Sequence, residues 1–147
     1  MTYEIRQLAL GDTGAAAKVM RSSFEERLPT LAGLHTPEED AGFVRDHMFP
    51  ASEMWGAFDP DLVGFIAFTD DWIEQFYILP DWQGRGIGKA LLEVAKSKCK
   101  TLRLWTFQQN VPARQFYERN GFVLVELTNG DTNEHREPDA LYEWARR

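Results

Sequence analysis

Apolar and polar residues recur along the chain with two different periods, which predict a mixture of strands and helices. Alternation over residues 3–8 predicts a first strand. Apolar residues three and four apart predict helices over 13–26 and from 37 to about 48. Asp12 can cap the first helix, and Thr36-Pro37-Glu38-Glu39 is a capping box that opens the second. Residues 28–34 between them are interpreted as a loop.

The second half of the chain continues this alternation of elements. Apolar runs over 54–58 and 62–69, joined by Asp59-Pro60-Asp61, predict a hairpin. The aromatic and β-branched run over 72–79 predicts a buried strand that Pro80 ends. The remaining predicted elements are a helix over about 86–98, a strand over 102–107, a helix over 111–119, and strands over 122–127 and 140–145. The order β-α-α-β-β-β-α-β-α-β-β shows no repeat or linker, so we expect one α/β domain.

A glycine-rich turn separates the strand over 72–79 from the helix that follows it. Gly84, Gly86 and Gly88 lack a Cβ atom, so a ligand could approach the backbone closely there. The first N–H groups of the helix have no internal partner and lie at the positive end of its dipole. The turn therefore predicts an anion site, most naturally for a phosphate. The alternative is a tight strand-to-helix connection without a ligand. Neither the Walker A spacing nor the dinucleotide-binding spacing is present.

Composition narrows the function classes. The chain has 147 residues, of which 44% are hydrophobic, enough for the core of one domain. No apolar run has membrane-spanning length, so we expect a cytoplasmic protein without a membrane partner. The net charge of −7 argues against nonspecific binding to nucleic acid. Cys99 is the only cysteine and the three histidines are scattered, so no disulfide and no metal site are expected.

Two sequence blocks together resemble one protein family. Gln83-Gly84-Arg85-Gly86-Ile87-Gly88 resembles the Gln/Arg-x-x-Gly-x-Gly/Ala signature of the GNAT superfamily of N-acetyltransferases. Residues 110–122 are similar to its second block, with Asn110, Ala113, Phe116-Tyr117 and Gly121-Phe122 in the matching places. The resemblance is close over residues 64–122 and implies a single domain over 1–147. It also implies a mixed, mostly antiparallel sheet of about seven strands, α/β (α+β) in class, with helices on both faces.

The resemblance also implies where the cofactor, acetyl-CoA (coenzyme A), would bind. It would lie in a splay between the strand before the glycine-rich turn and the strand over 102–107. The residues implied for cofactor binding are Ile78, through its backbone, Gln83, Gly84, Arg85, Gly86, Ile87, Gly88, Lys89 and Asn110. Arg85 and Lys89 could instead be solvated charges, and Asn110 could be a plain helix cap.

Two side chains are candidates for proton transfer. Tyr117 occupies the family position of the acid that protonates the departing thiolate, a reaction that a neutral phenol can perform. The alternative is a buried tyrosine with its hydroxyl bonded elsewhere. Glu74 is the candidate base, because apolar neighbours would favour its uptake of a proton. An exposed or ion-paired carboxylate is the alternative there, and Asp71 or a water relay could replace it.

The sequence therefore predicts an acetyl-CoA-dependent N-acetyltransferase that moves an acetyl group to a primary amine by direct attack. A coenzyme-binding or regulatory domain without catalysis is one alternative, and a different phosphate-binding module is another. The acceptor, a small amine or a peptide amine, is not encoded in any motif. His35 is expected in a loop on the substrate side. Exposed strands in such a fold often pair, which allows a homodimer.

Overall fold

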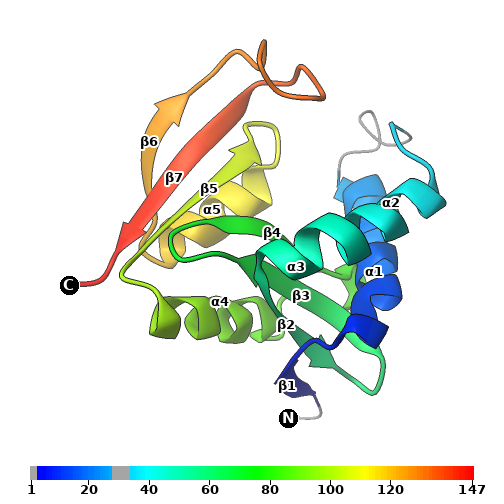
Figure 1. Cartoon of the computed structure of the whole chain (residues 1–147). Coiled ribbons are helices and arrows are strands. Elements are labelled where there is room, and N and C mark those ends of the chain that lie inside the picture. Colours follow the sequence, from blue (N-terminus) through cyan, green and yellow to red (C-terminus); the bar gives the residue numbers. More distant parts are fainter. Residues whose placement is uncertain (1–2, 28–33) are drawn as a thin grey trace.

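The computed structural model describes residues 3–27 and 34–147, which contain two antiparallel sheets and the helices packed on them. One sheet has the strand order β1-β2-β3-β4 and the other has the order β5-β7-β6 (Figure 1). The strands are β1 (Glu4–Gln7), β2 (Glu53–Phe58), β3 (Leu62–Phe68), β4 (Ile73–Ile78), β5 (Thr101–Phe107), β6 (Val123–Leu127) and β7 (Asp139–Ala145). The expected α/β (α+β) fold with seven strands is confirmed, with the strands divided between two sheets.

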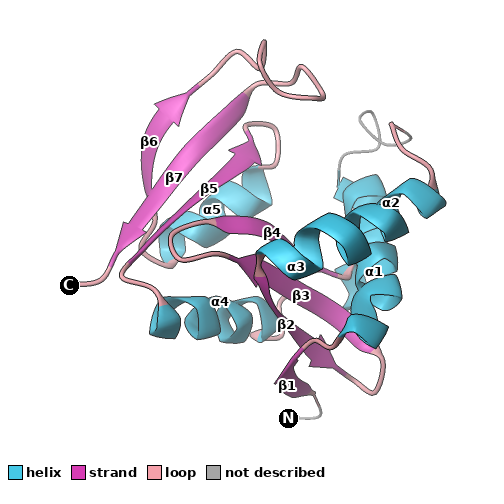
Figure 2. Ribbon diagram, viewed as in Figure 1, coloured by secondary structure: helices cyan, strands magenta, loops and turns pink. Residues whose placement is uncertain are grey.

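Helices cover both faces of the four-stranded sheet (Figure 2). The helices are α1 (Thr13–Arg27), α2 (Pro37–Phe43), α3 (Phe49–Ala51), α4 (Ile87–Lys98) and α5 (Val111–Arg119), of which α5 contacts β6 of the other sheet. The capping box before α2 is present, because Thr36 and Glu39 each bond the other's backbone N–H. No helix among residues 3–27 and 34–147 has the length and apolar content needed to cross a membrane.

The position of β3 in the fold explains why its sequence is apolar without interruption. It is buried at every position, because helices pack on both of its faces. On one face Ile66 packs in a cluster with Leu91 of α4. On the other face Phe65 packs with Val19 of α1 and Val44 after α2. The strand is thus the centre of the first sheet and holds the neighbouring β4 in place.

A short backbone bridge joins the two sheets. Trp72, just before β4, forms an isolated parallel bridge with Arg103 of β5, and the Arg103 N–H donates to the Asp71 oxygen at 2.8 Å. Beyond this bridge β4 and β5 diverge, as Figure 1 shows. The splay that the resemblance implied is therefore present, and it opens toward the C-terminal ends of both strands.

The expectation that β4 is a buried strand was wrong. Ile73 is its only fully buried residue, because no strand pairs with its second edge beyond the bridge. Its register against β3 also shifts, so that Ala67 faces Gln75 while Phe68 faces Ile73. Glu74 is the extra residue of this β-bulge and pairs with no residue of β3.

Two helix boundaries also differ from the prediction. Asp12 does not cap α1, because its carboxylate accepts from the Ala9 N–H at 2.8 Å and pairs with Arg6. The helix expected to end near 48 continues to Ala51 through a π-helical turn, Val44–Met48. Pro50 has no N–H to donate, which interrupts the regular helical ladder at this point. The loop expected over 28–34 lies outside the described residues, except for Leu34.

Candidate active site

The glycine-rich turn presents an open stretch of backbone at the start of α4. Gly84 and Gly86 have φ angles of 78° and 84°, which favour glycine over residues with a Cβ atom. A Cβ atom built on either would meet nothing within 4 Å. The turn thus has the conformation that lets a ligand approach its N–H groups, as the sequence predicts for an anion site.

A groove of about 530 Å³ lies between this turn and α5, and we call it the cofactor groove. Most of the residues predicted for cofactor binding line it, namely Ile78, Gln83, Gly84, Gly86, Gly88, Lys89 and Asn110. Asn110 also caps α5 through its Oδ1 atom, so the two interpretations of this residue are compatible. Among the described residues that line the groove, Lys89 is one of two cations and none is a carboxylate.

The structure does not place two of the predicted residues in the groove wall. The Ile87 side chain is 1% exposed and belongs to the core, so only its backbone could serve a ligand. The Arg85 guanidinium lies 5.8 Å from the centre of the Trp82 ring, outside the groove lining. The second cation of the groove is Arg119 at the end of α5, which the sequence analysis missed. Its spacing of three residues from Phe116 on the same helix could have revealed it.

Some backbone N–H groups of β4 point into the splay and not toward β3. Because the Leu79 N–H donates to the Val63 oxygen, the backbone N–H groups of Tyr77 and Gln75 also point to β3, and those of Phe76 and Ile78 point to the opposite side. The Ile78 oxygen already accepts from Gln83 Nε2 at 2.9 Å and from a serine of α1. The N–H groups of Phe76 and Ile78 therefore point to the side that β5 leaves open.

Tyr117 lies where the cofactor groove meets a second cavity. Its side chain is 8% exposed and packs against Phe76, Phe116, Phe122 and Tyr142. The hydroxyl has no hydrogen-bond partner among residues 3–27 and 34–147. Burial raises the pKa of this phenol well above its usual range, so it stays protonated at neutral pH. A neutral, unbonded hydroxyl facing a cavity is a suitable proton donor.

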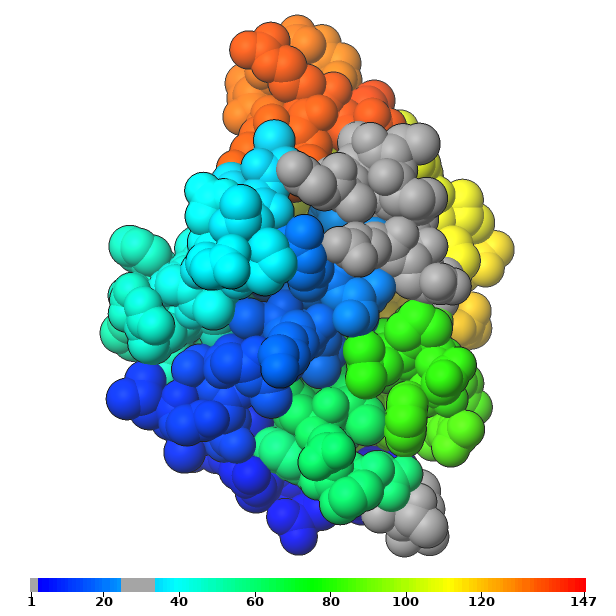
Figure 3. Space-filling view, turned by 90° about the vertical axis from the view of Figure 1, so that its right-hand side faces the viewer, coloured from blue at the N-terminus to red at the C-terminus, as the bar shows by residue number. Residues whose placement is uncertain are grey.

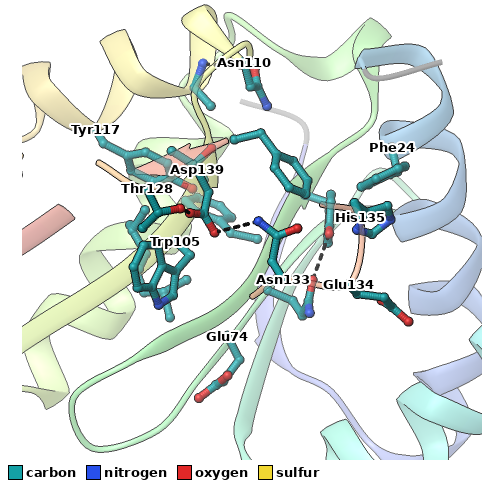
Figure 4. A pocket seen from close by; sticks show the side chains of 18 of the residues that line it. Phe24, Glu74, Trp105, Asn110, Tyr117, Thr128, Asn133, Glu134, His135 and Asp139 are labelled. Carbon is teal, nitrogen blue, oxygen red and sulfur yellow. Dashed lines mark hydrogen bonds between the residues drawn. The ribbon is translucent and has the colours of Figure 1, made fainter. Parts of the chain in front are cut away.

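The second cavity, here called the inner cavity, has a volume of about 550 Å³ and lies between β4, β5 and the loop before β7. Its wall includes the predicted base Glu74, which is exposed at the bulge of β4. In Figure 4 Glu74 lies at the opposite end of the cavity from Tyr117 and its carboxylate points away from it. The alternative base Asp71 lines a different hollow, beside Lys98.

Asp139 is a carboxylate of the inner cavity that sequence reasoning missed. Thr128 Oγ1 donates a hydrogen bond to one of its oxygens, and Asn133 Nδ2 lies 3.3 Å from the other. Figure 4 shows it between Tyr117 and Asn133, with both of these bonds drawn. The polar stretch before β7 gave no motif, because its residues meet only when the loop folds back onto β5.

A third hollow, the outer lobe, continues from the inner cavity toward α1 and α2. Its volume is about 630 Å³, and it shares Phe24, Tyr77 and His135 with the inner cavity. His35 Nε2 lies 2.7 Å from a carboxylate oxygen of Glu134, which joins the start of α2 to the loop before β7. Figure 3 shows these two segments, cyan and orange, meeting on one face. His35 therefore lines the outer lobe, and its place on the substrate side stays a prediction.

The chain resembles acetyltransferases in sequence and in structure. Residues 50–124 match the family described as Acetyltransferase (GNAT) domain. The Peptidyl-lysine N-acetyltransferase YiaC of Escherichia coli (strain K12) is 30% identical over 103 residues, covering 69% of each chain. The Spermidine N(1)-acetyltransferase of Thermoplasma acidophilum is 29% identical over 155 residues, covering 89% of this chain and 94% of that protein. The structure of the PaiA N-acetyltransferase of Thermoplasma acidophilum in complex with coenzyme A has a TM-score of 0.71 and 24% identity, covering 99% of this chain and 100% of that one.

Proposed function

Because this chain belongs to the GNAT acetyltransferase family, we propose that its groove and inner cavity form the active site for acetyl transfer from acetyl-CoA to a primary amine. The amine attacks the thioester carbonyl directly, since one site can hold both partners close together. We propose that residues 1–147 act as a single domain in this reaction. The observation that supports the proposal best is the Tyr117 hydroxyl, which lies where the groove meets the inner cavity and has no hydrogen-bond partner among the described residues.

The cofactor groove fits the charge and shape of a coenzyme A molecule. Its open glycine turn offers backbone N–H groups to a pyrophosphate, and Lys89 and Arg119 add positive charge. We propose that the outward-facing backbone of Phe76 and Ile78 binds the pantetheine arm. Asn110 lies at the far wall of the same groove. When bound, acetyl-CoA supplies the acetyl thioester, and the groove residues hold and orient it.

We propose that Tyr117 donates the proton that the departing thiolate needs. A phenol whose pKa is raised by burial remains neutral, and a thiolate bears most of the charge that develops in this step. Placing the donor in a buried wall also excludes water from the reacting atoms.

The incoming amine must lose a proton before or during its attack. An alkylammonium group has a pKa of about 10.4, so removing its proton at pH 7 costs roughly 4–5 kcal/mol. We propose Glu74 as the base that receives this proton. Because its carboxylate points away from Tyr117, the transfer runs through a water relay along the inner cavity.

A further part of the proposal concerns assembly. β6 is an edge strand that is exposed throughout, and four of its residues are apolar: Val123, Leu124, Val125 and Leu127. An apolar edge of this kind favours pairing with another copy, so we propose a homodimer through β6. We expect Val125→Lys to convert dimer to monomer in light scattering behind a sizing column. A monomeric wild type would contradict this part alone.

The test of the activity combines binding with turnover. We expect calorimetric titration to show acetyl-CoA binding, and a thiol-release assay to show turnover when a primary amine is added. Binding without turnover over a broad panel of amines would favour a domain that has lost catalysis. Absence of both binding and turnover would contradict the proposed active site.

A further inference from the structure

The inner cavity and the outer lobe share wall residues such as Phe24 and Tyr77, and together we call them the acceptor path. The inner cavity is the part of this path that reaches Tyr117. Among the described residues that line it, Glu74, Glu134 and Asp139 are acidic and none is a lysine or an arginine. A cation that enters the inner cavity therefore meets negative charge that no lining cation offsets.

The three carboxylates of the inner cavity have different surroundings. The Glu134 carboxylate already lies 2.7 Å from an imidazole nitrogen of the outer lobe. Glu74 lies at the bulge of β4, and its carboxylate points away from Tyr117. Asp139 begins β7, and Figure 4 shows it on the side of the cavity where Tyr117 lies. Asp139 is thus the carboxylate on the side of the proposed acetyl transfer.

Neutral groups of the loop before β7 hold the Asp139 carboxylate. One oxygen accepts from the Thr128 hydroxyl, which itself accepts from the Gly130 N–H at 3.2 Å. The other oxygen lies 3.3 Å from Nδ2 of Asn133, whose amide also bonds the backbone of Glu137 at 2.6 and 3.2 Å. These bonds orient both donors, so both carboxylate oxygens are held. No cation pairs with this carboxylate in the part of the chain that the structure describes.

A carboxylate held in this way can still bind a ligand. Its two oxygens offer about four lone-pair positions, and the bonds to Thr128 and Asn133 occupy two of them. Because removing a carboxylate from water without a cation is costly, the half-buried Asp139 favours a ligand that supplies one. A hydrogen bond between an ammonium group and a carboxylate is about twice as strong as one between neutral groups.

We infer that Asp139 binds the reacting ammonium group of the acceptor and holds its nitrogen on the Tyr117 side of the inner cavity. Asp139 accepts a hydrogen bond from the ammonium group before the proton leaves through the water relay to Glu74. This inference rests on the proposed acetyltransferase function and adds a substrate-binding residue to it. It also limits the acceptor, because an amine with a carboxylate on the adjacent carbon would bring a second negative charge against Asp139.

The experiment compares three ligands of the same chain length that differ in charge. Butylamine carries an ammonium group at pH 7, whereas O-propylhydroxylamine stays neutral because alkoxyamines are weak bases. Norvaline is butylamine with a carboxylate on the carbon next to nitrogen. Their dissociation constants are measured by NMR titration of the intact protein, which requires no turnover. We expect butylamine to bind about tenfold or more tightly than the other two, since one charge-assisted contact is worth about that factor.

Two variants separate a charge effect from a change of fold. Asp139→Asn removes the charge and keeps an oxygen that can accept the Thr128 bond. We expect the preference for butylamine to fall about tenfold in this variant, whereas a purely structural change would weaken the binding of all three ligands alike. Asp131→Asn makes the same change in the same loop, outside the lining of the inner cavity, and should leave the preference unchanged.

The comparison in wild type does not depend on the folding of any variant. Equal affinity for butylamine and O-propylhydroxylamine, tight binding of norvaline, or no binding of butylamine would overturn the inference. A preference for butylamine that Asp139→Asn leaves intact would also overturn it. If butylamine binds as expected but acetyl-CoA neither binds nor acetylates it, the proposed function fails and the ammonium site remains.

Discussion

The cofactor groove and the acceptor path meet at Tyr117 and are constructed in opposite ways. The groove is lined mainly by the end of β4, the turn after it and one face of α5, with Ser23 of α1 added, and its charged residues are Lys89 and Arg119. The acceptor path is assembled from α1, α2, β4, β5 and the loop before β7, and carboxylates such as Glu39 and Glu134 line it. An enzyme whose cofactor is a polyanion and whose substrate is a cation can thus hold each of them in a region of opposite electrostatic potential, a short distance apart.

The largest expected effect comes from placing an acidic residue in the groove. Gly86→Glu adds a carboxylate beside the proposed phosphate site, and its φ of 84° strains any residue with a Cβ atom. We expect calorimetry to show about a hundredfold or greater loss of acetyl-CoA affinity. Gly14→Glu, in the open first turn of α1, is the matched control. Unchanged affinity in the Gly86 variant would mean that the phosphates bind elsewhere.

The Tyr117 hydroxyl lies in the wall shared by the cofactor groove and the inner cavity. Its removal should lower the rate of the chemical step and leave both binding regions intact. We expect Tyr117→Phe to lower kcat about a hundredfold, the usual value of a general acid. Its stability should change little, because the hydroxyl has no partner among the described residues. Tyr142→Phe is the contrasting variant: its hydroxyl bonds Arg114 and Glu118, so we expect a loss of about 1 kcal/mol in urea unfolding. A kcat unaffected by Tyr117→Phe would remove the acid from the mechanism.

A smaller effect is expected where the acceptor path begins at β4. Glu74→Gln removes the proposed base, and a water relay through another group would still operate, so we expect about a tenfold decrease in kcat/KM. The decrease should shrink as the pH rises and more of the amine is already deprotonated. Glu126→Gln on exposed β6 is the matched control. A decrease of the same size at every pH would contradict the role as base.

The last effect is on stability at high pH alone and concerns Tyr77, on the strand that separates the two regions. Burial raises its pKa to about 12, against about 10 for an exposed phenol. Between these values the unfolded chain loses the proton first, so stability falls as the pH rises from 10 to 12, by up to about 2 kcal/mol. We expect urea midpoints to follow this fall in wild type and less so in Tyr77→Phe. Urea midpoints that fall equally with pH in wild type and in Tyr77→Phe would contradict the raised pKa of Tyr77.

The same contrast explains what the sequence could predict. The glycine turn and the block from Asn110 to Tyr117 are local sequence patterns. Most of their residues that line the groove could therefore be predicted from the sequence. The sequence analysis missed Arg119, although its spacing of three residues from Phe116 on the same helix can be seen in the sequence. Asp139 and Glu134 could not be found in this way, because they reach the path only through the fold of a loop far along the chain. The direction in which the Glu74 side chain points depends on a β-bulge. One extra residue creates this bulge, and the pattern of apolar residues does not reveal it.

The unpaired edge of β4 has a consequence for exchange with solvent. The amide hydrogens of Phe76 and Ile78 point into the splay, whereas those of Tyr77 and Gln75 are bonded to β3. In deuterated buffer the first pair should exchange quickly in the ligand-free protein and the second pair slowly, giving an alternating pattern along one strand. Acetyl-CoA should slow the fast pair and make the strand uniform. At its proposed position the cofactor would thus supply hydrogen-bond partners to the free edge of β4, the last strand of the four-stranded sheet.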